Sequence, residues 1–504
     1  MRQWMVAAKK ADFYAIAEKF HVDPVVARII RNREVIGEKN IRIYLGGNLS
    51  DLSDPHQMKD MDRLGEILAQ KIRKQVHIRI IGDYDVDGVT SSHLFLTALR
   101  RVGAKVDVVI PHRIQDGYGL SLHLLQQAKE DGVDTILTCD NGIAAIDEIA
   151  WAKAQKMTVL VTDHHAVPFE EHEGRRTEKK SLADAVVNPH QQDCRYPYKE
   201  LCGAGVAWNV IRVLYENYDM DKREAEDLLD FVAMATVCDV MSLTGENRIL
   251  VKEGLKRIRH TKNIGLQALM QACNVQPENI SAYHFGYVLG PCVNATGRLD
   301  TARHALRLFE TGQETEAEEI ARDLVDLNQE RKELTLQGVE MAKKLCEEGG
   351  YENDPVLVLF LPDVHESIAG LIAGRIREMY NRPVFVLTRG EEGVKGSGRS
   401  TENYSMYENM CGCAELFTKF GGHPMAAGLS LPEENVEKFR RKINENCPLT
   451  VEEVCPDIHI DMAMPVGYAS TELVHQFALL EPFGKDNPSP LFADRNLSIS
   501  RMWV

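Results

Sequence analysis

The sequence predicts an α/β protein in which a doubly wound, mostly parallel sheet is joined by a long helix to a smaller α/β domain. Two observations carry this prediction. Between residues 56 and 200, strand-length apolar runs alternate with segments of helical periodicity, which is the pattern of successive β-α-β units. A second alternation of the same kind begins at residue 354, after a long charged segment (316–345) that contains no proline.

The composition is that of an ordinary globular protein. Of the 504 residues, 44% are hydrophobic and 27% are charged, and no apolar run reaches the ~18 residues that a membrane-spanning helix needs. Charges interrupt the N-terminal stretch, which argues against a signal peptide, and the eleven cysteines form no disulfide-like framework, so we expect a cytoplasmic location. The net charge of −16 disfavours a protein that coats nucleic acid through bulk electrostatics, but not an enzyme that concentrates positive charge in one groove.

The expected elements follow from these periodicities. Short amphipathic helices come first and end in a Ser/Asp/Pro-rich link. β-Branched runs then predict the strands of the parallel sheet at 77–82, 105–111, 134–139, 157–162 and 183–188. A mostly helical region follows, and the second sheet is expected from the runs at 354–362, 382–390, 393–400 and 419–432.

These patterns divide the chain into five segments. The last segment ends in the strand-like run LSISRMWV, so we expect it to be the truncated start of a further domain. The expected segments are an N-terminal helical segment (1–55), a catalytic domain with a helical extension (56–312), a connecting helix (313–350), a smaller substrate-binding α/β domain (351–450) and the truncated region (451–504).

Three aspartates, Asp83, Asp85 and Asp87, follow the first strand of the sheet on alternate positions. Three carboxylates in five residues repel one another unless a cation or a proton neutralises them. The sequence pattern is that of an EF-hand calcium loop. However, the twelfth position of such a loop would be Leu94 instead of a glutamate, and a predicted strand precedes the motif instead of a helix. The aspartates therefore lie in a strand-to-helix turn, where open α/β sheets bind ligands. For Asp87 the role stays open between a metal ligand, a support behind the ligands and a helix cap.

Further acids and imidazoles follow other apolar runs. Asp140 comes after the third strand, Asp163, His164 and His165 come after the fourth, and Asp239 ends the run LLDFVAMATVC. Because the carboxyl ends of parallel strands lie along one edge of a sheet, we expect these side chains to converge. Carboxylate oxygens with one or two imidazoles and no thiolate favour Mn²⁺ or Mg²⁺ over zinc. Two such ions would activate water for hydrolysis of a phosphoester or phosphoanhydride.

The motifs DYDVDG, CDNG, DHH and CDV occur in the order of the four motifs of the DHH phosphoesterase superfamily, which the sequence resembles. GSGRS and GGHPMAAG resemble its DHH-associated domain, and PHRIQDGYGL, VNATGRL, LNQERK and EPFGKDNPSP are similar to the RecJ family within it. The resemblance implies a DHH domain, a DHH-associated domain and the first strand of an OB-fold. It also implies a metal-dependent hydrolase: an exonuclease that degrades single-stranded DNA from the 5′ end in DNA repair and recombination.

The resemblance also implies a role for each site residue. The metal ligands would be Asp83, Asp85, Asp140, His164 and Asp239. Around them, His165 would contact the scissile phosphate, Asp163 would orient the His164 ring, and Asp87 is the open case. The substrate-binding residues would be Arg113, Arg298, Ser397, Arg399 and His423, the last three from the smaller domain.

Two alternative functions would use the same residues. A phosphodiesterase of short oligonucleotides or cyclic dinucleotides would share the metal site, but small substrates need neither the N-terminal helices nor an OB-like tail. A non-catalytic DNA-binding scaffold of the same superfamily would gain nothing from uncompensated carboxylates. The expected partner is single-stranded DNA, with a helicase and a single-strand-binding protein as candidates. No coiled-coil seam is visible, so we expect a monomer.

Overall fold

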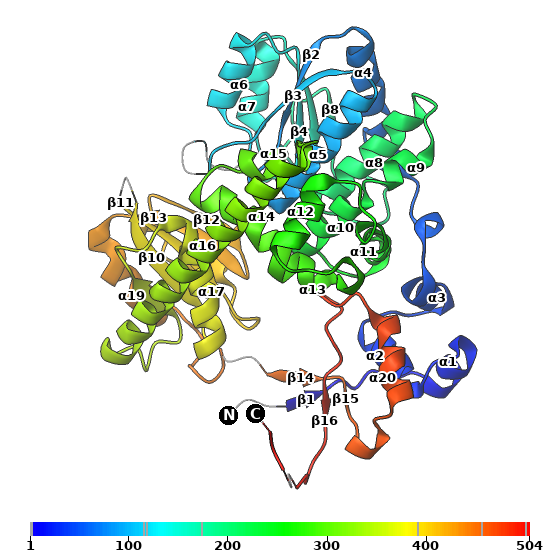
Figure 1. Cartoon of the computed structure of the whole chain (residues 1–504). Coiled ribbons are helices and arrows are strands. Elements are labelled where there is room, and N and C mark those ends of the chain that lie inside the picture. Colours follow the sequence, from blue (N-terminus) through cyan, green and yellow to red (C-terminus); the bar gives the residue numbers. More distant parts are fainter. Residues whose placement is uncertain are drawn as a thin grey trace. The chain divides into compact units, whose positions relative to one another are not determined.

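The computed structural model describes residues 4–113, 116, 119–172, 175–390, 393–454, 457–498 and 501–503. The chain forms two compact units that alternate along the sequence. The larger unit comprises Lys9–Asn328 and Pro465–Pro490, and the smaller unit comprises Met1–Ala8, Gln329–Met464 and Leu491–Val504. Figure 1 gives the element labels used below.

A parallel five-stranded sheet forms the centre of the larger unit, with the strand order β3-β2-β4-β5-β8. The five strands predicted from the sequence are confirmed. They are β2 (His77–Ile81), β3 (Lys105–Val109), β4 (Thr135–Cys139), β5 (Thr158–Thr162) and β8 (Ala185–Val187). β3 pairs with one edge of β2, and β4 pairs with the other edge. The direction in which successive strands are added to the sheet therefore reverses between β2 and β4. Open α/β sheets bind ligands at such a switch point.

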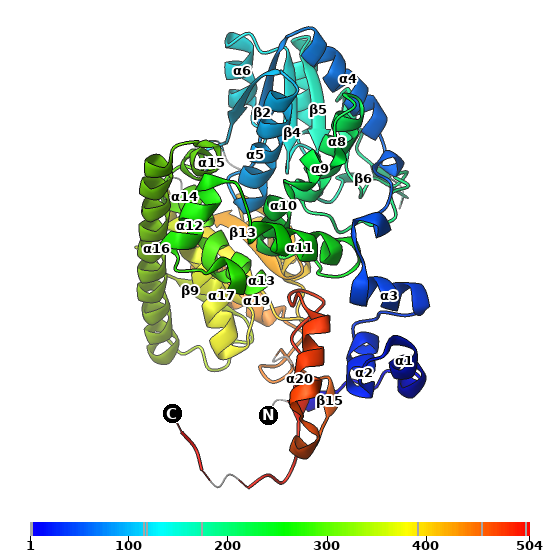
Figure 2. The same ribbon diagram turned by 45° about the vertical axis from the view of Figure 1, so that its right-hand side comes forward.

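Helices cover both faces of this sheet (Figures 1 and 2), which confirms the doubly wound prediction. Successive strand residues point to opposite faces, so Ile80 packs in one core cluster and Ile81 in the other. The helices on the first face are α4 (Met61–Arg73), α5 (Val86–Arg101) and α8 (Gly203–Glu216), and those on the second are α6 (Leu122–Glu130) and α7 (Ile146–Ala154). A polar hairpin that the apolar pattern did not predict adds β6 (Phe169–His172) and β7 (Arg175–Glu178).

The helical extension of the larger unit contains a π-helical turn at Phe285–Leu289, directly before α14. The apolar run before Asp239 is a helix, α10. The extension comprises α9 (Lys222–Glu226), α10 (Leu229–Cys238), α11 (Gly245–Ile258), α12 (Ile264–Ala272), α13 (Ala282–His284), α14 (Gly290–Leu299) and α15 (Arg303–Glu310).

A buried arginine joins three distant segments of the larger unit. The Arg248 guanidinium in α11 donates hydrogen bonds to the carbonyl oxygens of Tyr44 (2.7 Å), Leu479 (2.9 Å) and Leu480 (3.0 Å). These bonds tie the 465–490 segment and the N-terminal helices to the helical extension. The helices concerned are α1 (Phe13–Phe20), α2 (Pro24–Asn32), α3 (Glu38–Gly46) and α20 (Thr471–Phe477). The predicted N-terminal helices are thus confirmed.

The predicted connecting helix is α16 (Glu314–Glu348), a continuous helix that begins in the larger unit and ends in the smaller one. The smaller unit has a mixed sheet of order β12-β13-β11-β10-β9 with apolar clusters on both faces. Its elements are β9 (Leu357–Phe360), α17 (Ala369–Tyr380), β10 (Val384–Gly390), β11 (Gly393–Arg399), α18 (Met406–Cys411), β12 (Lys419–His423), β13 (Ala426–Leu431) and α19 (Val436–Glu445).

Two short parallel pairs complete the smaller unit: β1 (Trp4–Val6) with β14 (Ile458–Ile460), and β15 (Met462–Ala463) with β16 (Phe492–Ala493). The strand predicted from LSISRMWV is absent at residues 497–498 and 501–503, and the rest of that run lies outside the described residues. A strand forms only where its backbone groups find a partner, and these described residues pair with none. Among the described helices, none is both long enough and apolar enough to span a membrane.

Candidate metal centre

The turns after β2 and β4 place Asp83 and Asp140 at the switch point of the sheet, where both are buried (1% and 2% exposed). Asp85 is the N-cap of α5 and accepts a hydrogen bond from the Gly88 amide (3.0 Å). Asp140 has a left-handed backbone with φ 62°, a conformation that aspartate adopts more readily than most residues. The neighbouring Gly203 allows this placement, because a Cβ there would lie 2.7 Å from the Asp140 Cβ.

Asp87 is buried and lies against the first turn of α8. Its carboxylate accepts hydrogen bonds from the amides of Gly203 (2.6 Å) and Ala204 (2.8 Å). These are two of the donors that a helix N-terminus leaves without an intrahelical partner, and the helix dipole favours a negative charge there. Asp87 therefore holds the start of α8. Its Oδ2 also lies 3.6 Å from His164 Nε2, which keeps it within the cluster.

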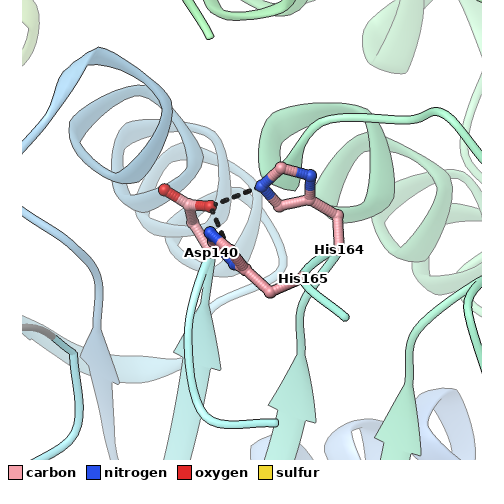
Figure 3. A group of neighbouring side chains, drawn as sticks. All are labelled: Asp140, His164 and His165. Carbon is pink, nitrogen blue, oxygen red and sulfur yellow. Dashed lines mark ion pairs between the residues drawn. The ribbon is translucent and has the colours of Figure 1, made fainter. Parts of the chain in front are cut away.

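His164 follows β5 and brings the separate acids together. Its Nε2 atom lies 3.0 Å from Asp140 Oδ1 and 3.6 Å from Asp239 Oδ2. Figure 3 shows the His164 and His165 rings both facing the same oxygen of the Asp140 carboxylate, with His165 Nδ1 4.0 Å from Asp140 Oδ1. The residues that sequence reasoning placed at this edge of the sheet therefore do converge.

Asp163 acts on a different ring from the one we predicted. Its Oδ1 accepts a hydrogen bond from His165 Nδ1 (2.8 Å), whereas it contacts His164 only through the backbone amide (2.7 Å). Its Oδ2 accepts from the Ile143 amide (2.8 Å). Burial alone would raise the pKa of Asp163, but the hydrogen bonds and positive charge of His165 hold it below its usual range. The prediction that Asp163 orients the His164 ring is wrong, because the carboxylate faces the next imidazole.

The donor atoms form three overlapping groups, in each of which all atoms lie within 4.8 Å of one another. The pKa values of Asp83, Asp140 and Asp239 are raised well above the usual range. Burial is the largest cause, and the charges of the neighbouring carboxylates are the next largest. Oδ1 of Asp83 is buried and has no hydrogen-bond partner among the described residues. Divalent cations would relieve this repulsion and supply the missing contact, so these residues fit a metal site. The groups are Asp83–Asp85–Asp140, Asp87–His164–Asp239 and Asp140–His164–His165.

Two arginines predicted to bind substrate lie beside the acidic turn. The Arg113 guanidinium lies 4.8 Å from the centre of the Tyr84 ring. Burial and Asp83 raise the pKa of Tyr84 to about 12, whereas the charges of Arg113 and Arg298 lower it. Next to Arg298, Gly297 packs against the Tyr84 carbonyl, where a Cβ would come within 2.4 Å. Positive charge therefore borders the carboxylates on this side.

The three remaining predicted residues lie in the smaller unit and gather at one end of its sheet. Arg399 on β11 and His423 on β12 both pair with Ala426 of the intervening strand β13, and Ser397 pairs with Gly428 on the same strand. His423 is exposed, whereas Ser397 and Arg399 are partly buried. These three residues therefore lie near one another within the smaller unit.

Sequence reasoning missed the contribution of the α8 N-terminus, whose Gly203 and Ala204 amides hold Asp87. The signal was present as the run CGAGVA at the start of a helical pattern, since glycine and alanine let another backbone approach closely. It also missed Asn294, whose side-chain oxygen accepts a hydrogen bond from the Val86 amide (3.2 Å) and ties α14 to the start of α5.

Family models match three parts of the chain. The model described as DHH family, N-terminal domain, matches residues 77–236, the DHHA1 domain matches 353–447, and the RecJ OB domain matches 460–504. The first model contains every acid and imidazole of the cluster except Asp239, which lies three residues beyond its end.

Several curated relatives are named single-stranded-DNA-specific exonuclease RecJ. The protein from Haemophilus influenzae is 35% identical, over 84% of this chain and 74% of its own length. The protein from Salmonella typhimurium is 34% identical, over 94% of this chain and 83% of its own length. The protein from Bacillus subtilis is 33% identical over 94% of this chain, which spans 59% of that relative's length.

Solved structures give the same relationship. RecJ from Thermus thermophilus in complex with Mn²⁺ superposes with a TM-score of 0.82 at 28% identity, covering 97% of this chain and 69% of that one. A structure of exonuclease RecJ bound to manganese superposes with a TM-score of 0.65 at 30% identity, covering 84% of this chain and 98% of that one.

Proposed function

Because this chain belongs to the RecJ family, we propose that it is a metal-dependent exonuclease that hydrolyses phosphodiester bonds of single-stranded DNA from the 5′ end. The observation that supports this most strongly is the complete set of carboxylates and imidazoles at the switch point, in three groups of which Asp140 joins two and His164 joins two. A scaffold would have no use for buried carboxylates that repel one another.

We assign the metal ligands to Asp83, Asp85, Asp140, His164 and Asp239, with Mn²⁺ or Mg²⁺ as the ion. The RecJ relatives whose structures contain Mn²⁺ support this choice of metal. When bound, two such ions would activate a water molecule and neutralise charge on the phosphoryl oxygens. The protein's own part is to fix these donors in place before the ions arrive, through the Asp85 cap on α5 and the contact of Asp87 with α8.

We infer that His165 contacts the scissile phosphate. The hydrogen bond from its Nδ1 to Asp163 fixes the orientation of the ring, so that Nε2 is the atom that would reach a phosphate oxygen. Asp163 is in turn held by the Ile143 amide, which makes it a positioning residue. Asp87 is a second positioning residue, because it joins α8 to the cluster.

Arg113 and Arg298 are proposed to bind substrate phosphates beside the centre, and Ser397, Arg399 and His423 are proposed to bind the strand from the smaller unit. Roles in DNA repair and recombination, a helicase and a single-strand-binding protein as partners, a monomeric state and a cytoplasmic location remain predictions that accompany this proposal.

The test compares substrates in the presence of Mn²⁺. End-labelled long single strands, dinucleotides and a duplex of the same sequence are incubated with the full chain, and products are resolved by length. We expect stepwise shortening of the long single strand from its 5′ end and no attack on the duplex. Cleavage confined to dinucleotides would refute the exonuclease proposal, and the absence of any metal-dependent product would favour a scaffold.

A further inference from the structure

A groove of about 640 Å³ lies beside the metal centre, within the larger unit. Cys238 and Val240, the neighbours of Asp239 on either side, line one wall. The other walls are formed by α13 with the π-helical turn and by the 481–489 loop, which lies next to α13 (Figure 1). The groove therefore lies next to Asp239, a proposed metal ligand, whose two chain neighbours form part of its wall.

Two exposed tyrosines stack on one another in this groove. Tyr283 and Tyr287 are 62% and 72% exposed, and their ring centroids lie 5.1 Å apart at an interplanar angle of 25°. The π-helical turn that carries Tyr287 precedes Pro291, which has no amide proton for the helical ladder. Exposed aromatic rings that contribute nothing to the core are characteristic of binding surfaces. Because one face of each ring is turned toward the other tyrosine, a ligand would stack on the outer faces of the pair.

The same groove is lined by more cationic than acidic side chains. Arg259 and Lys485 both line it, and neither side chain has an ion pair among the described residues. Glu481 is the one acidic residue among those that line the groove. In a chain with a net charge of −16, this local excess of cations is notable.

We propose that this groove binds the single strand next to the scissile phosphate, with unpaired bases stacked on Tyr283 and Tyr287 and backbone phosphates contacted by Arg259 and Lys485. The inference rests on the proposed function and specifies where its substrate lies. Aromatic platforms beside cations are how proteins hold single strands without sequence preference, since every base has a flat face. In a duplex the faces of the bases are already stacked on one another, so the platform also selects unpaired nucleic acid.

The experiment measures binding and turnover separately. The dissociation constants of labelled oligothymidylates of roughly 4 to 16 nucleotides are measured by fluorescence anisotropy in the presence of EDTA. The full chain is compared with the Tyr283→Ser/Tyr287→Ser double variant and with Tyr14→Ser, which changes an exposed tyrosine on α1 outside the groove. We expect the double variant to bind long strands about tenfold or more weakly for each lost stack, whereas Tyr14→Ser binds like the unmodified chain.

Turnover of a thymidine dinucleotide in Mn²⁺ should fall much less in the double variant than the affinity for long strands, because so short a substrate can occupy only the end of the platform nearest the metal centre. Two further variants sharpen the assignment. Tyr283→Trp/Tyr287→Trp should restore the binding that serine removes, since tryptophan keeps the stacking face. Arg259→Ala should reduce the slope of log K against log salt by about 0.7, which is one phosphate contact.

Equal affinities of the unmodified chain and the double serine variant for long strands would overturn the proposal, as would a serine variant that loses dinucleotide turnover to the same extent as long-strand binding. Failure of the proposed function has a different signature: the unmodified chain would then cleave no single strand in Mn²⁺. The anisotropy comparison would still decide whether the groove binds unpaired bases.

Discussion

The metal centre and the Arg248 anchor both bury charged groups in the larger unit, and they satisfy them in opposite ways. Arg248 donates to three carbonyl oxygens, and its guanidinium lies 3.9 Å from the centre of the Tyr44 ring. At the centre, by contrast, the carboxylates face one another and Oδ1 of Asp83 has no hydrogen-bond partner among the described residues. Buried charge that the chain satisfies stabilises the fold, whereas buried charge that it leaves unsatisfied indicates a ligand from outside.

Removal of Asp140 should produce the largest effect. Its carboxylate belongs to two of the three donor groups, so Asp140→Ala should lower the Mn²⁺-dependent turnover of single strands by about a thousandfold or more. The melting temperature without metal should fall only slightly, because the loss of repulsion offsets the cost of placing alanine in the left-handed conformation of Asp140. Asp147→Ala, which changes an exposed acid of α7, is the matched control. Activity near that of the unmodified chain in Asp140→Ala would contradict the metal assignment.

Arg248→Met should show the reverse pattern. It leaves three carbonyl oxygens without their donor, and we expect the free energy of unfolding to fall by about 3–5 kcal/mol in urea titrations. Turnover well below the melting temperature should change little. Arg223→Met removes an arginine whose side chain is 83% exposed and should stay within about 0.5 kcal/mol of the unmodified chain. An Arg248→Met variant as stable as the control would show that the anchor does not stabilise the larger unit.

Added Mn²⁺ should separate the two regions in one experiment. At 100 times its dissociation constant, a ligand that binds only the folded state raises the free energy of unfolding by about 2.7 kcal/mol. We expect that increment in the unmodified chain and in Arg248→Met, but not in Asp140→Ala. Calorimetric scans with and without the ion measure it. An equal gain in Asp140→Ala would place the stabilising ion elsewhere.

A change at His93 should have the smallest effect. His93 is a third kind of buried ionisable group, one that stays neutral. Its ring lies against Phe231 and Phe309, with centroids 4.4 and 5.8 Å away, and burial lowers its pKa to about 3. Because the unfolded chain binds a proton below about pH 6.5 and the folded chain does not, stability should fall as the pH drops from 6.5 toward 3. Between pH 7.5 and pH 5, the free energy of unfolding should fall by about 2 kcal/mol less in His93→Phe than in the unmodified chain. Urea titrations at both pH values measure this difference. An unchanged pH dependence would mean that His93 does not remain neutral.

The sequence predicted the acids that follow β2, β4 and β5 because strand periodicity locates the carboxyl ends of strands, and residues at those ends of a parallel sheet lie along one edge. Asp239 ends the helix α10, so only its place after an apolar run indicated it. The sequence could not predict which imidazole Asp163 contacts, since that depends on how the two rings turn after β5. The buried role of Arg248 could not be predicted from the sequence for a different reason. Its partners lie 204 to 232 residues away, and nothing in the local run ENRILVKEGL separates it from an exposed arginine of an amphipathic helix. The stacking of Tyr283 on Tyr287 likewise appears only once the π-helical turn has formed.

The start of α8 makes the assembly of the metal centre depend on the packing of a segment more than 100 residues further along the chain. Asp87 reaches its position only when the Gly203 and Ala204 amides have docked against it, and Asp140 approaches closely only where Gly203 has no side chain. The last donor, Asp239, leaves the ribosome long after Asp83 does. A nascent or partly folded chain therefore carries the acids without the geometry, and the donor groups assemble only when this part of the larger unit has packed.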